Sequence, residues 1–323
     1  MIWWERHQVL LYIAAIAAGA MGGLTLPELS HPLELAIDPV LGLLMYAIFL
    51  GVPFTAAAQA LGDWRFVAAI LVLNFALVPI VVFGLSRFVQ GEAALLIGVL
   101  LVLLTPCVDY VIVFSGLAGG ARSHLLAVTP LLILLQMLLL PIYLWLMAGP
   151  DVVEAFAVRP FFEAFLLLIA LPMSLAALTQ RMAAKSRAVR AIKNVVIAAM
   201  VPLVMLTLAV VVGSQIFAVS GSIGSLIVVL PIFLLFALIL APLGALAARI
   251  AQLGVPEQRA VVFSGVTRNS LVVLPLALAL PPSFALTPLV IVTQTLVELV
   301  VMVVMVAVLP LVIRDADGPA RSV

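Results

Sequence analysis

Three charged residues stand within long apolar stretches of the sequence, where charged side chains are rare: Asp109, Arg268 and Glu298. A charge at the centre of a bilayer costs about 2.5–3.5 kcal/mol on insertion scales, and such residues usually face a cavity or one another. Two interpretations follow from this. The charges mark the pathway of an ion or a substrate, or they form a fixed ion pair that only holds helices together.

Residues that disturb a helix stand close to two of these charges. Pro106 precedes Asp109, and Gly265 precedes Arg268 by three residues. Proline removes a backbone donor and clashes with the preceding turn, so it kinks or ends a helix. Helices interrupted at matching places in two halves of a chain are typical of a transporter's binding site. We therefore predict helix breaks at Pro106 and Gly265, and a crossing at which Asp109 and Arg268 form an ion pair.

The chain has a single cysteine, Cys107, directly after Pro106, which excludes an intrachain disulfide. A lone buried cysteine commonly acts as a small hydrophobic residue. At the start of a half-helix, however, free N–H groups favour the thiolate, and a soft thiolate selects soft metals and metalloids. We predict that Cys107 binds the substrate. No other metal site is expected, because the histidines share no ligand spacing.

The composition indicates a protein that crosses a membrane many times. Apolar residues make up 66% of the chain and charged residues 9%, whereas soluble domains carry about 25% charged residues. A span needs about 20 apolar residues and must be helical to satisfy its own backbone. The predicted fold is therefore an all-α membrane protein with ten transmembrane helices. The predicted spans are residues 8–24, 39–60, 65–88, 93–118, 123–148, 160–180, 190–212, 223–248, 258–281 and 285–313.

Residues 127–136 (AVTPLLILLQ) are repeated as residues 285–294 (ALTPLVIVTQ). Chance similarity between leucine-rich helices is the alternative, but a shared Thr-Pro and Gln at one offset favours an internal duplication. Ten spans give five per half, and an odd number inverts the second half in the membrane. The predicted organisation is given by four ranges: a first repeat over 1–150, a periplasmic linker over 151–158, a second repeat over 159–314, and a cytoplasmic tail over 315–323.

The repeated segment also places polar residues on one helical face. Thr287, Gln294 and Glu298 share a face at helical spacing, and Gln136 is the counterpart of Gln294 in the first repeat. A carboxyl group in apolar surroundings can take up and release a proton, so we predict that Glu298 and Asp109 couple transport to protons. The alternative for Glu298 is a carboxyl group hydrogen-bonded to a neighbouring helix. Asn269, Gln136 and Gln294 are predicted to contact the substrate.

The distribution of basic residues predicts the orientation. Of the 15 Lys and Arg residues, 12 fall in segments on the same side of the membrane as the N-terminus, 2 fall on the opposite side, and Arg268 lies within a span. The positive-inside rule then places both termini in the cytoplasm and the chain in the inner membrane. The sequence has no phosphate-binding loop or other catalytic motif, so neither an enzyme nor a cofactor is predicted, and a nucleic-acid partner is not expected.

The chain resembles the bile acid:sodium symporter superfamily and, within it, the arsenite efflux permeases. The similarity is sharpest over residues 105–120 (TPCVDYVIVFSGLAGG) and in the Leu-Val-Glu element that ends at Glu298. By resemblance, Cys107 is required for metalloid transport and Glu298 is the required glutamate of the last hydrophobic region. The resemblance also implies ten spans in inverted repeats, crossed fourth and ninth helices, and a panel and a core domain that rock against each other.

The sequence departs from both branches of that superfamily near Arg268. Sodium-coupled relatives place a Glu and a Gln where Ser264 and Arg268 fall, and an arginine there would repel sodium. This departure favours proton coupling over sodium coupling. Together with the resemblance, it predicts export of arsenite, or of the related antimonite, in exchange for protons by alternating access. The alternative is a cation-coupled symporter that takes up a small organic anion, with Arg268 paired to the substrate's carboxylate or sulfonate. The expected partners are the metalloid, protons and the lipid bilayer.

Overall fold

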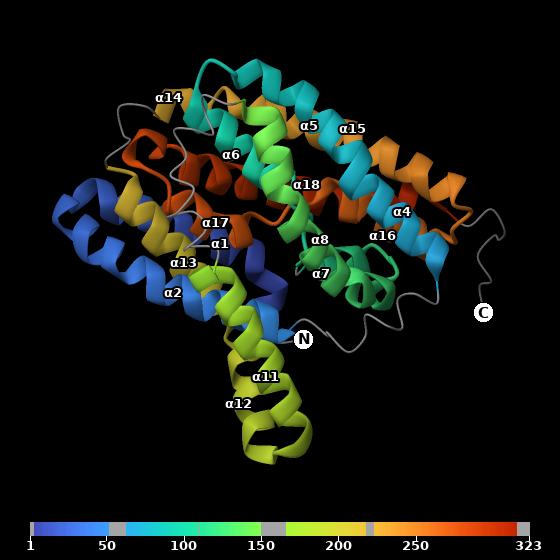
Figure 1. Cartoon of the computed structure of the whole chain (residues 1–323), viewed down its shortest axis with the longest axis horizontal. Coiled ribbons are helices and arrows are strands. Elements are labelled where there is room, and N and C mark those ends of the chain that lie inside the picture. Colours follow the sequence, from blue (N-terminus) through green and yellow to red (C-terminus); the bar gives the residue numbers. More distant parts are fainter. Residues whose placement is uncertain (1–2, 52–62, 109, 150–165, 218–222, 315–323) are drawn as a thin grey trace.

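The computed structural model describes residues 3–51, 63–108, 110–149, 166–217 and 223–314, and it has no β-strand in these ranges (Figure 1). The longer helices are α1 (Trp3–Thr25), α2 (Ser30–Gly51), α4 (Trp64–Val72), α5 (Val78–Ser86), α6 (Ala93–Leu103), α7 (Tyr110–Leu117), α8 (Arg122–Ala148), α11 (Leu171–Lys185), α12 (Arg187–Ala198), α13 (Met200–Gln215), α15 (Val229–Ile250), α16 (Val255–Val266), α17 (Ser270–Leu278) and α18 (Thr287–Val312). The shorter elements include a π-helical turn at Leu73–Leu77, which joins α4 to α5, a second π-helical turn at Leu166–Ala170 before α11, and α14 (Ile223–Leu226).

Each of the ten predicted spans coincides, in whole or in part, with one or two of these helices. Five continuous helical segments of the described chain are long and apolar enough to cross a membrane, or six if the bent pair α12 and α13 counts as one span. The chain is thus an all-helical, multi-pass membrane protein, while the count of ten and the inverted repeat stay predictions. The 48° bend between α12 and α13 was not predicted. It follows from Pro202 in the first turn of α13, which cannot donate to the carbonyl group of Ala198.

The helices form two groups that differ in their neighbours. The first group contains α1, α2, α11, α12 and α13, and the second contains α4 to α8 and α15 to α18. In Figure 1 the first group fills the left and lower parts, with α11 and α12 projecting as a pair, and the second group fills the rest. Contacts of α13 with α18 and of α2 with α17 join the groups. This division is consistent with a panel and a core domain.

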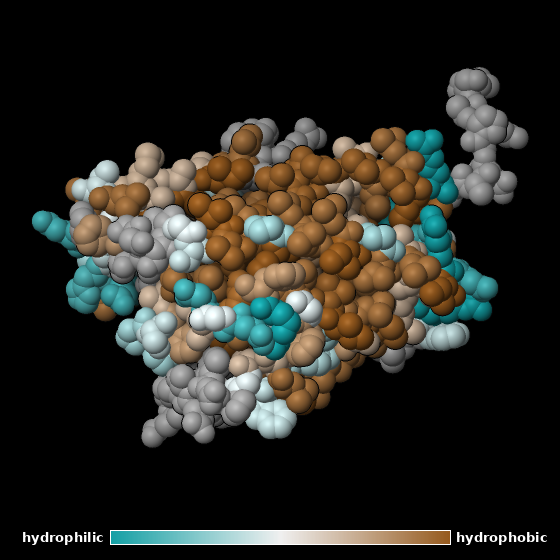
Figure 2. Space-filling view, turned by 90° about the horizontal axis from the view of Figure 1, so that it is seen from above, coloured by the Kyte–Doolittle hydropathy of each residue, from teal (hydrophilic) through white to brown (hydrophobic). Residues whose placement is uncertain are grey.

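Much of the outer surface is apolar. Long side chains such as Leu238 and Ile250 of α15 are 70% and 74% exposed. Figure 2 shows a broad hydrophobic face with hydrophilic residues at its two ends and in a smaller patch near its lower centre. A surface of this kind is stable in contact with lipid rather than with water. The buried residues form one continuous core that extends through both helix groups.

Glycines allow α1 and α13 to pack closely. Gly19 and Gly23 are four residues apart on α1, and a Cβ at either position would overlap the backbone of α13, at the carbonyl groups of Ala209 and Gly213. Small residues at this spacing bring the backbones of membrane helices together. The adjacent Gly22 has open space around it, and a Cβ there would meet no atom within 4 Å.

We therefore expect Gly23→Ala to destabilise the protein and Gly22→Ala to leave it unchanged or slightly more stable. Overpacking costs about 1–3 kcal/mol, whereas Ala in place of Gly improves helix propensity by about 1 kcal/mol. Thermal unfolding of the two purified variants in the same detergent measures the difference. Equal melting temperatures would show that α1 and α13 do not pack as the structure has them.

Candidate functional site

Two interrupted helices cross in the second helix group. α6 ends at Leu103 and α7 begins at Tyr110, while α16 ends at Val266 and α17 begins at Ser270. The extended residues between them pair as an antiparallel β-bridge formed by Pro106 and Arg268. Interruption frees backbone groups that must find new partners, and each break supplies partners to the other.

Two backbone hydrogen bonds flank this bridge. The N–H of Asn269 donates to the carbonyl oxygen of Thr105 at 2.8 Å, and the N–H of Cys107 donates to that of Thr267 at 3.3 Å. The side-chain hydroxyl groups of Thr105 and Thr267 in turn donate to carbonyl groups of the last turns of α6 and α16. Asn269 caps α17, because its side-chain oxygen accepts from the N–H of Val272. The breaks are thus fixed by local capping as well as by their mutual bridge.

Arg268 is fully buried at this crossing, and its guanidinium group donates to oxygens from three segments. Nη2 lies 2.8 Å from Oδ1 of Asn74, 2.7 Å from the carbonyl oxygen of Ser264 and 2.7 Å from that of Gly265. Nη1 lies 3.3 Å from the carbonyl oxygen of Leu103 at the end of α6. The guanidinium group therefore satisfies carbonyl groups that the two helix breaks expose.

Asn74 completes this arrangement and was not among the predicted site residues. It lies in the π-helical turn between α4 and α5, and its Nδ2 donates to the carbonyl oxygen of Ile70 and to the hydroxyl of Ser264, both at 3.0 Å. π-Helical turns are rare in proteins, and those that occur are often found at functional sites. The available signal was a polar residue in an otherwise apolar predicted span, but nothing in the sequence links it to Arg268, 194 positions later.

Glu298 approaches the same crossing from α18. Its carboxylate accepts a hydrogen bond from the backbone N–H of Arg268 at 2.8 Å and another from the side-chain amide of Gln294. Glu298 and Gln294 are both almost fully buried, at 3% exposure. The carboxylate therefore helps to hold the break between α16 and α17 in position.

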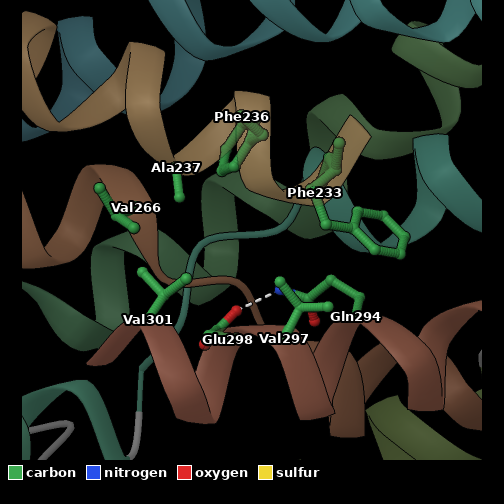
Figure 3. Close-up of a pocket in the computed structure, with 9 residues that line it drawn as sticks. Phe233, Phe236, Ala237, Val266, Gln294, Val297, Glu298 and Val301 are labelled. Atoms are coloured by element: carbon green, nitrogen blue, oxygen red, sulfur yellow. Dashed lines mark hydrogen bonds between the residues drawn. The ribbon is translucent and has the colours of Figure 1, made fainter. Parts of the chain in front are cut away.

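A small pocket adjoins Glu298 and Gln294. Figure 3 shows both residues projecting from α18 toward Phe233 and Phe236 of α15 across this pocket. Its volume of about 10 Å³ holds about one water molecule. The ring of Phe236 also packs against the guanidinium group of Arg268, with 5.3 Å between Cζ and the ring centroid.

The remaining predicted residues are placed as follows. Cys107 is 1% exposed and lies in the first break, not on the lipid-facing surface. Gln136 is buried in α8, and Oε1 of Gln136, Oε1 of Gln294 and Nδ2 of Asn269 make no hydrogen bond. Asp109 lies outside the described residues, so its ion pair with Arg268 stays a prediction. The structure thus brings Pro106, Cys107, Asn269 and Arg268 to one crossing, with Glu298 and Gln294 beside it, while Gln136 does not line the small pocket.

The arrangement has several features that a binding site needs. The described residues contain no group of three or more His, Cys, Asp or Glu side chains that could hold a metal ion. Interrupted helices offer free backbone groups, and the amide atoms without partners are buried, where leaving a polar group unpaired costs about 1–3 kcal/mol. A ligand with hydroxyl groups could supply the missing hydrogen bonds.

Comparison with known proteins identifies the family. A family model described as the Sodium Bile acid symporter family matches residues 38–222, more than half of the 323-residue chain. The matched range includes Asn74, Cys107 and Gln136 and ends before Arg268 and Glu298. A search of curated proteins found no match. The family match, the apolar helices and the crossed breaks agree, and the chain belongs to the Sodium Bile acid symporter family, whose members are membrane transporters.

Proposed function

We propose that the protein is a secondary transporter that exports arsenite, or the related antimonite, in exchange for protons. The observation that carries this proposal is the position of Cys107, the only cysteine, in the break that pairs with Thr267 and Arg268. A thiol there can displace one hydroxyl group of the metalloid hydroxide, which leaves as water with the thiol proton, and so form one bond from sulfur to the metalloid. With no second sulfur ligand, water can reverse this exchange when the substrate is released.

The chemistry of arsenite fits the polar atoms around the crossing. Arsenite is mainly a neutral hydroxide at neutral pH, and its hydroxyl groups both donate and accept hydrogen bonds. Asn269 offers an unpaired donor at Nδ2, and Gln294 offers an unpaired acceptor at Oε1. Gln136 of α8 also has an unpaired Oε1 and is a further candidate contact outside the small pocket. These groups would orient the hydroxide while the sulfur of Cys107 binds the metalloid centre.

Glu298 is the proposed proton carrier. Its carboxylate is buried beside a pocket of α15 and α18 and is hydrogen-bonded to the N–H of Arg268, so its protonation acts directly on the second break. Losing the negative charge weakens that hydrogen bond, because bonds to charged acceptors are about twice as strong as neutral ones. Proton uptake would thereby change how firmly the crossing is held. Asp109 is the second candidate for this role.

Alternating access follows from the two helix groups. In the proposed organisation the chain has two inverted five-helix repeats, 1–150 and 159–314, in the inner membrane, with both termini in the cytoplasm. The two groups meet where α13 contacts α18 and α2 contacts α17, and the crossing lies within the second group. Rocking of one group against the other would move the crossing relative to the first group. The site then opens to one side of the membrane at a time.

A strain that is sensitive to arsenite tests the metalloid role. Expression of the chain is expected to give resistance, and Cys107→Ala is expected to remove it, because the sequence has no other cysteine whose thiol could replace it. Val108→Ala is the matched control, since it truncates an equally buried neighbour. The measured quantity is the inhibitory arsenite concentration at equal amounts of membrane-inserted protein. If Cys107→Ala protects as well as the parent, the metalloid role fails.

The family match favours a second candidate, a cation-coupled symporter that takes up a small organic anion. In that case Arg268 would have to pair with the carboxylate or sulfonate of the substrate, although its guanidinium group already donates to four oxygens of the protein. Uptake of a labelled bile acid by cells in sodium and in choline medium distinguishes the candidates. Sodium-stimulated uptake would support the symporter.

A further inference from the structure

We propose that a groove between α4 and α15 binds an anionic phospholipid of the surrounding membrane. The groove has a volume of about 670 Å³, within the range of about 300–1,000 Å³ that is common for ligand sites. α4 and α15 contact each other, and in Figure 1 the start of α4 and the end of α15 lie on the same, right-hand side. The groove lies outside the crossing, so the inference does not rest on the proposed function.

The wall of the groove is apolar over most of its length. α4 contributes the exposed side chain of Val72, and α15 contributes those of Leu246 and Ile250. The lining residues on the first side extend from Trp64 to Leu77, which is about 20 Å along a helix that rises 1.5 Å per residue. One leaflet with its headgroups is also about 20 Å thick. The wall is therefore long enough to accompany an acyl chain through one leaflet.

One end of the groove has a positive charge that can bind a phosphate group. Trp64 and Arg65 begin α4 and line the groove, and Cζ of Arg65 lies 5.9 Å from the ring centroid of Trp64. Tryptophan is enriched at the level of the headgroups. Arg65 forms no ion pair with any described residue, while the neighbouring Asp63 caps the N–H of Phe66 and lies 3.6 Å from His124. The guanidinium group of Arg65 is thus available to an anionic headgroup.

Gln252 also lines the groove, in a backbone conformation that is unfavourable for a residue with a Cβ. Its φ is 57°, and it follows α15 in a turn where its N–H donates to the carbonyl oxygen of Arg249 and that of Leu253 donates to Ala248. Glycine is the usual residue at this position of a helix end. Residues held against their preference in this way are concentrated at ligand sites. The glutamine adds an amide donor for a phosphate oxygen, which a glycine would lack.

The groove also reaches the segment that supports the crossing. Val72 immediately precedes the π-helical turn and Leu77 ends it, and both residues line the groove. The turn carries Asn74, whose Oδ1 accepts a hydrogen bond from Arg268. A lipid in the groove would pack against this turn, so its binding should stabilise the folded protein.

The first test measures the melting temperature of the purified protein in a nonionic detergent while phosphatidylglycerol is added. We expect a saturable rise, by about 5 °C when the lipid is in hundredfold excess over its Kd. Phosphatidylcholine with the same acyl chains should give a smaller rise, and glycerol phosphate, which has no acyl chain, should give none. An equal rise with phosphatidylcholine, or no rise with phosphatidylglycerol, would contradict the inference.

Two variants address the polar end of the groove. Arg65→Gln is expected to weaken the apparent affinity for phosphatidylglycerol about fivefold, which is the contribution of one basic residue near a membrane surface. Gln252→Gly is expected to raise the melting temperature without lipid, because glycine suits the turn, and to reduce the response to phosphatidylglycerol. Arg181→Gln, which removes an exposed arginine of α11, is the control and should respond as the parent does. If all three variants respond as the parent does, this groove is not the lipid site.

A third variant addresses the apolar wall. Ala68→Leu narrows the groove and is expected to abolish the saturable rise, whereas Ala17→Leu adds the same bulk to an exposed position of α1 and should leave it intact. If a bile acid gives the saturable rise and phosphatidylglycerol does not, the groove binds a free amphipathic anion and the inference is wrong. Because the readout is stability, its failure is distinct from a failure of arsenite transport.

Discussion

Replacing Glu298 by Gln is expected to abolish proton-driven transport while leaving the protein folded. The glutamine keeps the size of the side chain and an oxygen that can accept from the N–H of Arg268, but it cannot release a proton. Flux driven by a pH gradient in proteoliposomes should therefore fall to that of protein-free vesicles. Exchange of labelled for unlabelled substrate without a gradient should continue, because exchange needs no net proton movement.

The matched control for this prediction is Glu92→Gln. Glu92 is an exposed carboxylate that immediately precedes α6, outside the crossing. Its replacement removes the same charge and should leave flux driven by a pH gradient unchanged. If Glu298→Gln still follows the pH gradient at the rate of the parent, Glu298 is not the proton carrier, and its carboxylate only fixes the position of Arg268.

The largest effect on stability is expected for Arg268→Met. Methionine fills a similar length but donates no hydrogen bond, so the carbonyl groups of Leu103, Ser264 and Gly265 and Oδ1 of Asn74 lose a donor. Leaving a buried polar group without its partner costs about 1–3 kcal/mol. The free energy of unfolding, measured by denaturant titration in detergent, should decrease by that amount.

Arg249→Met is the corresponding control, because Arg249 is exposed near the end of α15. A surface substitution of this kind changes stability by about 0.5 kcal/mol or less. Equal stability of the two variants would mean that the guanidinium group of Arg268 does not hold the two breaks together. The comparison needs no knowledge of the substrate.

The sequence predicted the elements of the site better than their contacts. Pro106 indicated the first break because proline cannot continue the hydrogen-bond pattern of α6, and Gly265 indicated a break that the structure has a few residues later, after Val266. The buried position of Arg268 and Glu298 followed from the cost of charge in lipid. These inferences need only local residue types, which a single sequence contains.

The partners of Arg268 could not be predicted in the same way. The sequence suggested Asp109, the nearest acid in the other interrupted span, and that residue lies outside the described ranges. The described partners are backbone carbonyl groups and Asn74, and any residue has a carbonyl group, so no residue type identifies them. Likewise, Glu298 accepts from the backbone of Arg268, which a reading of side chains alone does not reveal.

The same limit applies to the fold. Hydropathy located helices in all ten predicted segments, but five continuous segments, or six with the bent pair, are long enough to span by themselves in the described chain. The repeat of residues 127–136 at 285–294 falls in α8 and at the start of α18, two helices that each carry one buried glutamine of the predicted site. Whether the two predicted repeats are inverted relative to each other depends on how their helices are oriented in the membrane. Hydropathy locates apolar segments but gives no information on their orientation.

The most direct test is the flux of arsenite in proteoliposomes that contain the purified protein and no sodium. Imposing a pH gradient is expected to drive arsenite against its concentration gradient, and adding sodium on either side is expected to leave the rate unchanged, because the positive charge of Arg268 would repel sodium. Flux that follows a sodium gradient and ignores the pH gradient would contradict both the proton coupling and the role of Arg268.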